Sequence, residues 1–286
     1  MRILVTADLH FNHSRSRELA RDLIARMNDA GGDVLLVVGD TAVADGNDLE
    51  ECLSLFRFAG PKLLVAGNHE LWTKGSDSYK LLMEELPRRA EKIGWHWLAK
   101  QPFRFKDVAI VGTVGWYDYS FAQSELGIPR RFYERKISPG VAERESEYAD
   151  LLGDQSDIPA AAREFFARWN DGVHVKLGRS DEAFLEELLA TLDGQLKSVS
   201  DARSVIAAVH CLPFAQLLPP PHSAQWDFAK AYLGSGKIGD ILLKYPNVKR
   251  VYCGHSHFPA RARVGNIDAI NIGSGYRHKF FRLDDA

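Results

Sequence analysis

The hydrophobic positions in the first third of the chain form short continuous runs separated by stretches with a helical period. Apolar runs occupy residues 2–7, 33–38 and 62–66, a pattern typical of strands buried on both faces. Between them, residues 14–32 and 47–60 repeat apolar side chains at helical spacing. This strand–helix–strand–helix–strand order predicts a parallel sheet covered by helices.

The alternation continues beyond residue 76 and is interrupted once. Residues 120–178 are dense in charge and lack β-branched runs, so we interpret them as a helical, cap-like insertion within a single domain spanning residues 1–286. The pattern predicts helices at 77–92, 180–196 and 227–245, and strands beginning at 108, 204 and 248. Short strands at 260–264, 267–272 and 279–283 suggest antiparallel pairing at the end of a sheet.

Composition narrows the class of protein. The 286 residues are 45% hydrophobic and carry a net charge of −2, which argues against binding nucleic acid through bulk positive charge. Three widely separated cysteines, Cys52, Cys211 and Cys253, suggest a reducing compartment. The sequence has no signal-peptide pattern and no apolar run of about 20 residues, so we expect a soluble cytoplasmic protein without membrane contact.

Polar residues with ligand chemistry follow five of the predicted strands. They are Asp8 and His10, then Asp40, then Asn68 to Glu70 within "GNHE", then His210, and finally His255 and His257 within "GHSH". Ligands of α/β sheets bind beyond the carboxyl ends of the strands. Carboxylate, imidazole and amide oxygen without thiolate suit manganese, iron or zinc, and these residues are numerous enough for two ions.

An alternative to a metal site is a catalytic cysteine nucleophile, because Cys211 stands beside His210 in the sequence. Side chains alternate along a strand, which turns Cys211 away from His210 and toward the core. We therefore expect metal chemistry at this strand end and a structural role for Cys211.

The ordered motifs "DLH", "GD", "GNHE", a histidine after a strand and "GHSH" resemble those of the calcineurin-like metallophosphoesterase superfamily, and they extend from Asp8 to His257. The resemblance implies an α/β fold, a four-layer α-β-β-α sandwich, with two divalent metal ions at the sheet ends. We expect these ions to be manganese, with iron, zinc and nickel as alternatives. The implied ligands are Asp8, His10 and His257 for one ion, Asn68, His210 and His255 for the other, and Asp40 for both.

The same resemblance implies catalytic residues. Asp40 would fix the spacing of the ions, a metal-bound hydroxide would attack phosphorus, and His69 would act as an acid or a phosphate donor. Glu70 stands where many relatives carry aspartate, and we expect it to orient His69.

Candidate substrate contacts are less strongly indicated. Asn68 and His69 would face the phosphate. Tyr117 and Asp118 belong to an aromatic loop that should open near the metals, although such residues also pack insertions onto cores. His222 lies in a proline-rich loop, as either a pocket residue or an exposed one.

The leading functional hypothesis is a metal-dependent hydrolase of phosphate esters, a phosphodiesterase or a phosphatase, acting on a small phosphoester or nucleotide. A nuclease is the alternative, but it would need an open basic groove that the near-neutral charge does not favour. A non-catalytic metal-binding scaffold is a second alternative, disfavoured because every motif position is filled. The sequence carries no indication of oligomeric state.

Overall fold

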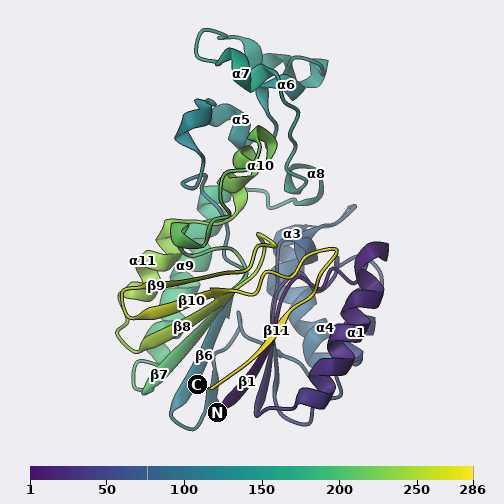
Figure 1. The fold of residues 1–286 in the computed structure, drawn as a ribbon, viewed down its shortest axis with the longest axis vertical. Helices are drawn as coiled ribbons and strands as arrows, with labels where there is room; N and C mark the ends of the chain where they lie inside the picture. The colour runs from purple at the N-terminus through teal and green to yellow at the C-terminus, as the bar shows by residue number, and fades with distance from the viewer. Residues whose placement is uncertain (76, 286) are drawn as a thin grey trace.

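Two β-sheets packed face to face form the centre of the computed structural model, which describes residues 1–75 and 77–285 (Figure 1). One sheet has the strand order β11-β1-β2-β3-β4 and the other β5-β6-β7-β8-β10-β9. The strands are β1 (Arg2–Thr6), β2 (Val34–Val38), β3 (Lys62–Val65), β4 (His96–Trp97), β5 (Phe103–Phe105), β6 (Val108–Thr113), β7 (Ser204–Val209), β8 (Val248–Cys253), β9 (Ala260–Val264), β10 (Ile267–Asn271) and β11 (Phe281–Asp285).

Helices cover the outer faces of both sheets, so the molecule has the expected four α-β-β-α layers. Figure 1 shows α1 and α4 outside the first sheet and α9 and α11 outside the second. The helices are α1 (Ser14–Ala30), α2 (Asp48–Ser54), α3 (Ser78–Lys80), α4 (Leu86–Lys92), α5 (Arg130–Glu134), α6 (Pro139–Ala142), α7 (Ala160–Arg163), α8 (Asp171–His174), α9 (Asp181–Ser198), α10 (Ala224–Ala229) and α11 (Gly236–Leu243). Among the described residues, none of the helices is long and apolar enough to cross a membrane.

The continuous apolar strands contribute side chains to two separate hydrophobic cores. In β2, Val34, Leu36 and Val38 pack between the sheets. Leu35 and Val37 of the same strand point into the separate cluster beneath the helices. Because side chains alternate along a strand, one fully apolar run is what a strand between two covered faces requires.

Several elements differ from the sequence-based expectation. Residues 77–92 form α3 and α4 joined by a π-helical turn at Leu81–Glu85, where Pro87 at the start of α4 removes one backbone donor. The strands β4 and β5 have two and three residues, too few to show a period. In the tail, β10 pairs antiparallel with β9 but parallel with β8, and β11 crosses to the first sheet to pair antiparallel with β1.

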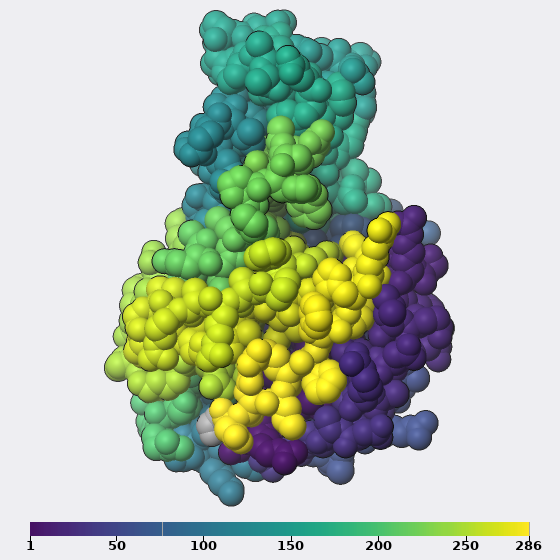
Figure 2. Space-filling view, in the orientation of Figure 1, coloured from purple at the N-terminus to yellow at the C-terminus, as the bar shows by residue number. Residues whose placement is uncertain are grey.

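Residues 120–178 carry the short helices α5 to α8 and project beyond the end of the sandwich (Figure 1). Figure 2 shows α10 lying between this inserted segment and the C-terminal part of the chain. The parallel strands point their carboxyl ends toward the insertion, so the residues that follow them lie in the space between sandwich and insertion.

Candidate active site

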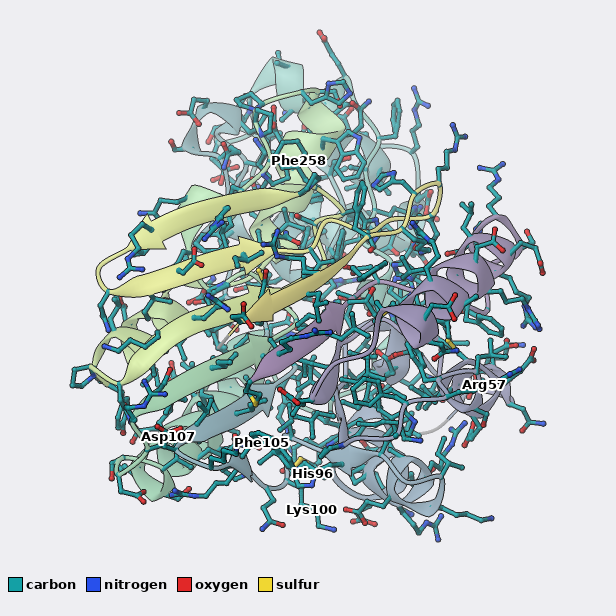
Figure 3. All side chains as sticks on the ribbon, turned by 60° about the horizontal axis from the view of Figure 1, so that its bottom comes forward. Arg57, His96, Lys100, Phe105, Asp107 and Phe258 are labelled. Atoms are coloured by element: carbon teal, nitrogen blue, oxygen red, sulfur yellow. The ribbon has the colours of Figure 1, made fainter. Side chains whose placement is uncertain are left out.

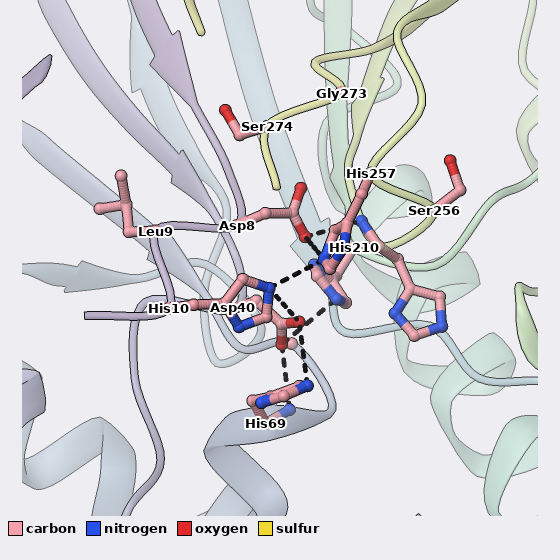
Figure 4. A network of polar contacts seen from close by, with 12 residues as sticks. Asp8, Leu9, His10, Asp40, His69, His210, Ser256, His257, Gly273 and Ser274 are labelled. Carbon is pink, nitrogen blue, oxygen red and sulfur yellow. Dashed lines mark hydrogen bonds and ion pairs between the residues drawn. The ribbon is translucent and has the colours of Figure 1, made fainter. Parts of the chain in front are cut away.

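The polar residues that follow five strands converge at one end of the sandwich (Figure 4). They are Asp8 and His10 after β1, Asp40 after β2, Asn68 and His69 after β3, His210 after β7, and His255 and His257 after β8. Although β1 to β3 and β7 to β8 belong to different sheets, their carboxyl ends face the same space. Nearly all of these side chains are buried, with His257 partly exposed.

Two groups of ligand atoms meet at Asp40. Asp8, His10, Asp40 and His257 form one group and Asp40, His210 and His255 the other, with the ligand atoms of each group within 4.8 Å of one another. Oδ2 of Asp40 lies 3.6 Å from Nε2 of His10, and Oδ1 lies 3.3 Å from Nε2 of His210. The two carboxylate oxygens of Asp40 therefore face different groups.

Several buried polar atoms at this centre lack a hydrogen-bond partner among the described residues: Oδ2 of Asp8, Nδ1 of His10, Oδ1 of Asn68 and Nε2 of His210. An unsatisfied buried polar atom is costly, and native proteins pair nearly all of them. All four atoms belong to residues that the sequence motifs indicate as metal ligands. The donor set fits two divalent cations.

Hydrogen bonds to backbone carbonyls determine which ring nitrogen of His210 and of His255 is available as a metal ligand. Nδ1 of His210 donates to the carbonyl oxygen of Val38 at 2.9 Å, which leaves Nε2 as the lone-pair nitrogen. Nε2 of His255 donates to the carbonyl oxygen of Tyr232 at 3.0 Å, which leaves Nδ1 free. Such partners orient an imidazole and select its tautomer, as metal sites require.

Five of the candidate ligands have a left-handed backbone conformation. Their φ angles are 55° at Asp8, 43° at His10, 52° at Asp40, 71° at His255 and 55° at His257. Non-glycine residues seldom adopt positive φ, and such strain concentrates at functional sites where the surrounding structure enforces it.

Glycines bring the backbone close to the ligands. A Cβ atom added to Gly67 would collide with Oδ1 of Asp40 and lie 2.7 Å from Nε2 of His210. A Cβ atom added to Gly254 would collide with Oδ2 of Asp8. The absence of a side chain at these two motif glycines therefore permits the close approach of backbone and ligands.

Glu70 has a different contact from the one expected. Its carboxylate accepts backbone N–H bonds from Asp40 (3.0 Å), Thr41 (2.6 Å), Ala42 (3.3 Å) and Gly67 (2.7 Å), so it joins the loops after β2 and β3. Burial and the nearby Asp40 raise the pKa of Glu70 to about 7, while the donated N–H bonds oppose that rise. The expectation that Glu70 orients the imidazole of His69 is therefore corrected. The carboxylate of Glu70 instead holds the backbone of the loops after β2 and β3.

The imidazole of His69 is held by aromatic neighbours. It stacks on Trp72 at 3.7 Å between ring centroids and meets His10 edge-on at 4.5 Å. Its Nε2 lies 3.9 Å from Oδ2 of Asp40. Burial lowers the pKa of His69, against the opposing effect of Asp40.

Asp171, from the insertion, orients Asn68, and no motif in the sequence points to this role. Nδ2 of Asn68 donates to Oδ1 of Asp171 at 2.9 Å, so Oδ1 of Asn68 faces the metal groups. Asp171 also accepts bonds from the indoles of Trp72 and Trp169 and from the hydroxyl of Tyr117. This carboxylate is 1% exposed and has four donors around it.

Two C-terminal residues also support the site. The amine of Lys279 is buried and donates to the backbone oxygen of Asp8 at 2.6 Å, and burial lowers its pKa to about 8. Tyr276 stacks on His10 at 4.4 Å. Only the position of these residues near the tail motif "GSGY" hints at such roles in the sequence.

Two residues expected to contact substrate, Tyr117 and Asp118, lie away from the chamber at the metal groups. Tyr117 is fully buried, and Asp118 accepts bonds from Ser120. Neither residue lines the chamber at the metal groups, because the aromatic loop packs the insertion onto the core. His222, in contrast, lines a cavity next to that chamber.

The chamber in front of the metal groups has a volume of about 190 Å³. Asp40, Asn68 and His69 form its floor, and residues 168–170 of the insertion contribute to its wall. A larger cavity of about 690 Å³ shares Trp226, His257 and Tyr276 with it. The site is therefore a small chamber that adjoins a larger cavity.

A two-sheet sandwich with two buried groups of carboxylate, imidazole and amide ligands that share one aspartate defines a metal-dependent phosphoester hydrolase. The chain belongs to the calcineurin-like phosphoesterase family, which matches residues 1–259. It is therefore a metallophosphoesterase, and divalent metal ions are its cofactors.

Two solved structures share this fold. The phosphopantetheinyl hydrolase of Mycobacterium tuberculosis is 20% identical with a TM-score of 0.69, over 96% of this chain and 89% of the other. A dimetal phosphatase from Danio rerio is 14% identical with a TM-score of 0.54, over 98% and 91%. At these identities the likeness concerns the fold. A search of curated proteins gave no match.

Proposed function

We propose that the protein hydrolyses small phosphate esters, as a phosphodiesterase or a phosphatase, with two manganese ions. The observation that carries this proposal is the pair of ligand groups that share Asp40. Asp8, His10 and His257 would hold one ion, Asn68, His210 and His255 would hold the other, and Asp40 would be shared between the two groups. Bound divalent ions neutralise phosphate charge and lower the pKa of water, so that water can attack phosphorus.

The protein's own residues supply position and proton transfer. Asp171 fixes the amide of Asn68, and Glu70 keeps the loops of Asp40 and Gly67 in register. His69 lines the chamber, with Trp72 stacked on its ring, and either protonates the departing ester oxygen or donates a hydrogen bond to the phosphate.

Access to the site favours small substrates over polymers. Residues 168–170 of the insertion line the chamber of about 190 Å³, so the insertion acts as a cap. A nuclease would need an open groove along which a strand could run.

The three cysteines are buried and unpaired, which supports a reducing, cytoplasmic location.

A substrate panel tests the proposal. Metal-free protein is supplied with manganese and assayed on p-nitrophenyl phosphate, bis(p-nitrophenyl) phosphate, nucleotides and single-stranded DNA. A phosphopantetheine ester belongs in the panel because the Mycobacterium tuberculosis neighbour is a phosphopantetheinyl hydrolase. We expect manganese-dependent hydrolysis of small esters. Hydrolysis that persists without metal, or that is restricted to DNA, would contradict the proposal.

A further inference from the structure

The larger cavity is a continuation of the candidate active site. Its volume is about 690 Å³, against about 190 Å³ for the chamber at the metal groups. Trp226, Leu233, Ser256, His257 and Tyr276 line both spaces. A phosphate bound at the metals would therefore have one of its ester groups at the entrance to this cavity.

Among the described residues, the charged side chains that line the cavity are basic. Arg15 and Arg277 line it, both are exposed, and neither forms an ion pair within the part of the chain that the structure describes. Lys230 is also present, but its amine is paired with Asp227 at 2.7 Å. The wall contains no Asp or Glu among the described residues. Two free guanidinium groups facing one cavity favour an anion, which they can bind with paired N–H groups.

The rest of the wall is apolar and partly aromatic. Trp226 is 51% exposed and Phe258 is 40% exposed, while residues 219–221 are three consecutive prolines. Figure 3 shows Phe258 at the end of the second sheet where β9 begins, far from the β5–β6 hairpin marked by Phe105 and Asp107. Large exposed apolar side chains gathered at a cavity indicate a binding surface, and a free indole face suits a ring.

We propose that the substrate is a phosphodiester with one arm that carries a ring and a second anionic group, and that this arm occupies the larger cavity. This inference rests on the proposed function. Water adds its oxygen to phosphorus, one P–O ester bond breaks, and the departing alkoxide takes a proton. The products are a phosphomonoester and an alcohol. Arg15 and Arg277 recognise the second anion, and Trp226 contacts the ring.

Two matched esters test the recognition of the second anion. The methyl ester of thymidine 5′-phosphate is compared with the same ester carrying a 3′-phosphate. The methyl group is small enough for either side of the chamber, so the nucleoside arm is free to enter the larger cavity. We expect kcat/KM to be about tenfold or more higher for the 3′-phosphorylated ester. Equal values for the two esters would overturn the inference.

Variants of the cavity wall test whether its arginines cause the preference for the 3′-phosphorylated ester. Replacing Arg15 and Arg277 together by glutamine should abolish the preference while leaving turnover of bis(p-nitrophenyl) phosphate, a diester without a second anionic group, unchanged. Arg57→Gln is the control, because Arg57 is exposed, likewise free of ion pairs among the described residues, and labelled in Figure 3 away from the cavity. A preference that survives the double substitution would overturn the inference.

A binding measurement separates this inference from the proposed function. Calorimetric titration of manganese-loaded protein should show tighter binding of thymidine 3′,5′-diphosphate than of thymidine 5′-phosphate, by about tenfold. The double arginine variant should bind both alike. Loss of turnover on every ester would refute the proposed function, whereas equal binding of the two nucleotides would refute the anionic subsite.

Discussion

The amide nitrogen of Asn68 donates a hydrogen bond of 2.9 Å to Asp171, a residue more than a hundred positions away that belongs to the insertion. This bond decides which end of the amide faces the metal groups. It leaves Oδ1 of Asn68 as a buried oxygen without a hydrogen-bond partner among the described residues. A residue outside the motifs thus selects the ligand atom of a residue within them.

We predict that Asp171→Asn weakens metal binding by about 10–100-fold, because the neutral amide would turn an N–H group toward donors that now point at a carboxylate. Metal affinity is measured by equilibrium dialysis. Asp181→Asn is the control. Asp181 also accepts bonds from an indole and a tyrosine, those of Trp116 and Tyr119, but it contacts none of the ligands. An equal loss of affinity in both variants would show a general structural effect.

Asp40→Asn should fold and lose activity together with at least one of the two ions. Its two oxygens face different ligand groups, and an amide offers only one oxygen. Elemental analysis after gel filtration gives the metal content. Asp118→Asn serves as control because that carboxylate caps a turn outside the chamber. Two tightly held ions in the Asp40 variant would refute the shared-ligand assignment.

Chelation should lower the melting temperature of the protein, and manganese should restore it. A ligand that binds only the folded state adds about 2.7 kcal/mol at a hundredfold excess over its dissociation constant. For a chain of this size that corresponds to a shift of about 4–5 °C. Differential scanning fluorimetry is sufficient. The same titration on the Asp40→Asn variant should give a smaller shift, and identical shifts would count against the site.

His69→Asn should slow the hydrolysis of alkyl esters far more than that of nitrophenyl esters. General-acid help contributes about 10²–10⁴-fold, and an alkoxide needs the proton whereas a nitrophenolate does not. The measurement is kcat/KM for both substrates at saturating manganese, with metal content checked in parallel. Equal losses on both esters would indicate that His69 only stabilises charge on the phosphate.

Gly67→Ala should reduce metal content and activity, because the added methyl group would collide with Oδ1 of Asp40. Gly194→Ala is the control: Gly194 lies within α9, and nothing lies within 4 Å of an added Cβ atom there. In a helix, alanine is favoured over glycine by about 1 kcal/mol, so the control should melt no lower than the wild type. Full metal content in Gly67→Ala would contradict the crowded geometry.

The predicted ligands came from local signals. Asp8, Asp40 and His255 each follow an apolar run, and both the run and the short motif are visible within about ten residues of sequence. Because parallel strands bring their ends to one edge, local patterns were enough to gather these residues in space.

The supporting residues could not be found in the same way. Asp171 lies in "NDG", which has the composition of an ordinary loop, and Lys279 contacts Asp8 across nearly the whole chain length. Tyr117 belongs to an aromatic loop that the sequence predicts to open near the metals, whereas packing buries its side chain completely. Such contacts depend on how the insertion folds back, and no short pattern encodes that.

The left-handed backbone at five candidate ligands also restricts how this centre could be re-engineered. Asp, Asn and His are several-fold enriched in that conformation, whereas other side chains meet steric strain there. Exchanging His257 for cysteine, or Asp8 for glutamate, to favour a softer or larger ion would therefore be opposed first by the main chain. The torsion angles of the main chain therefore restrict which residues can serve as ligands at these positions.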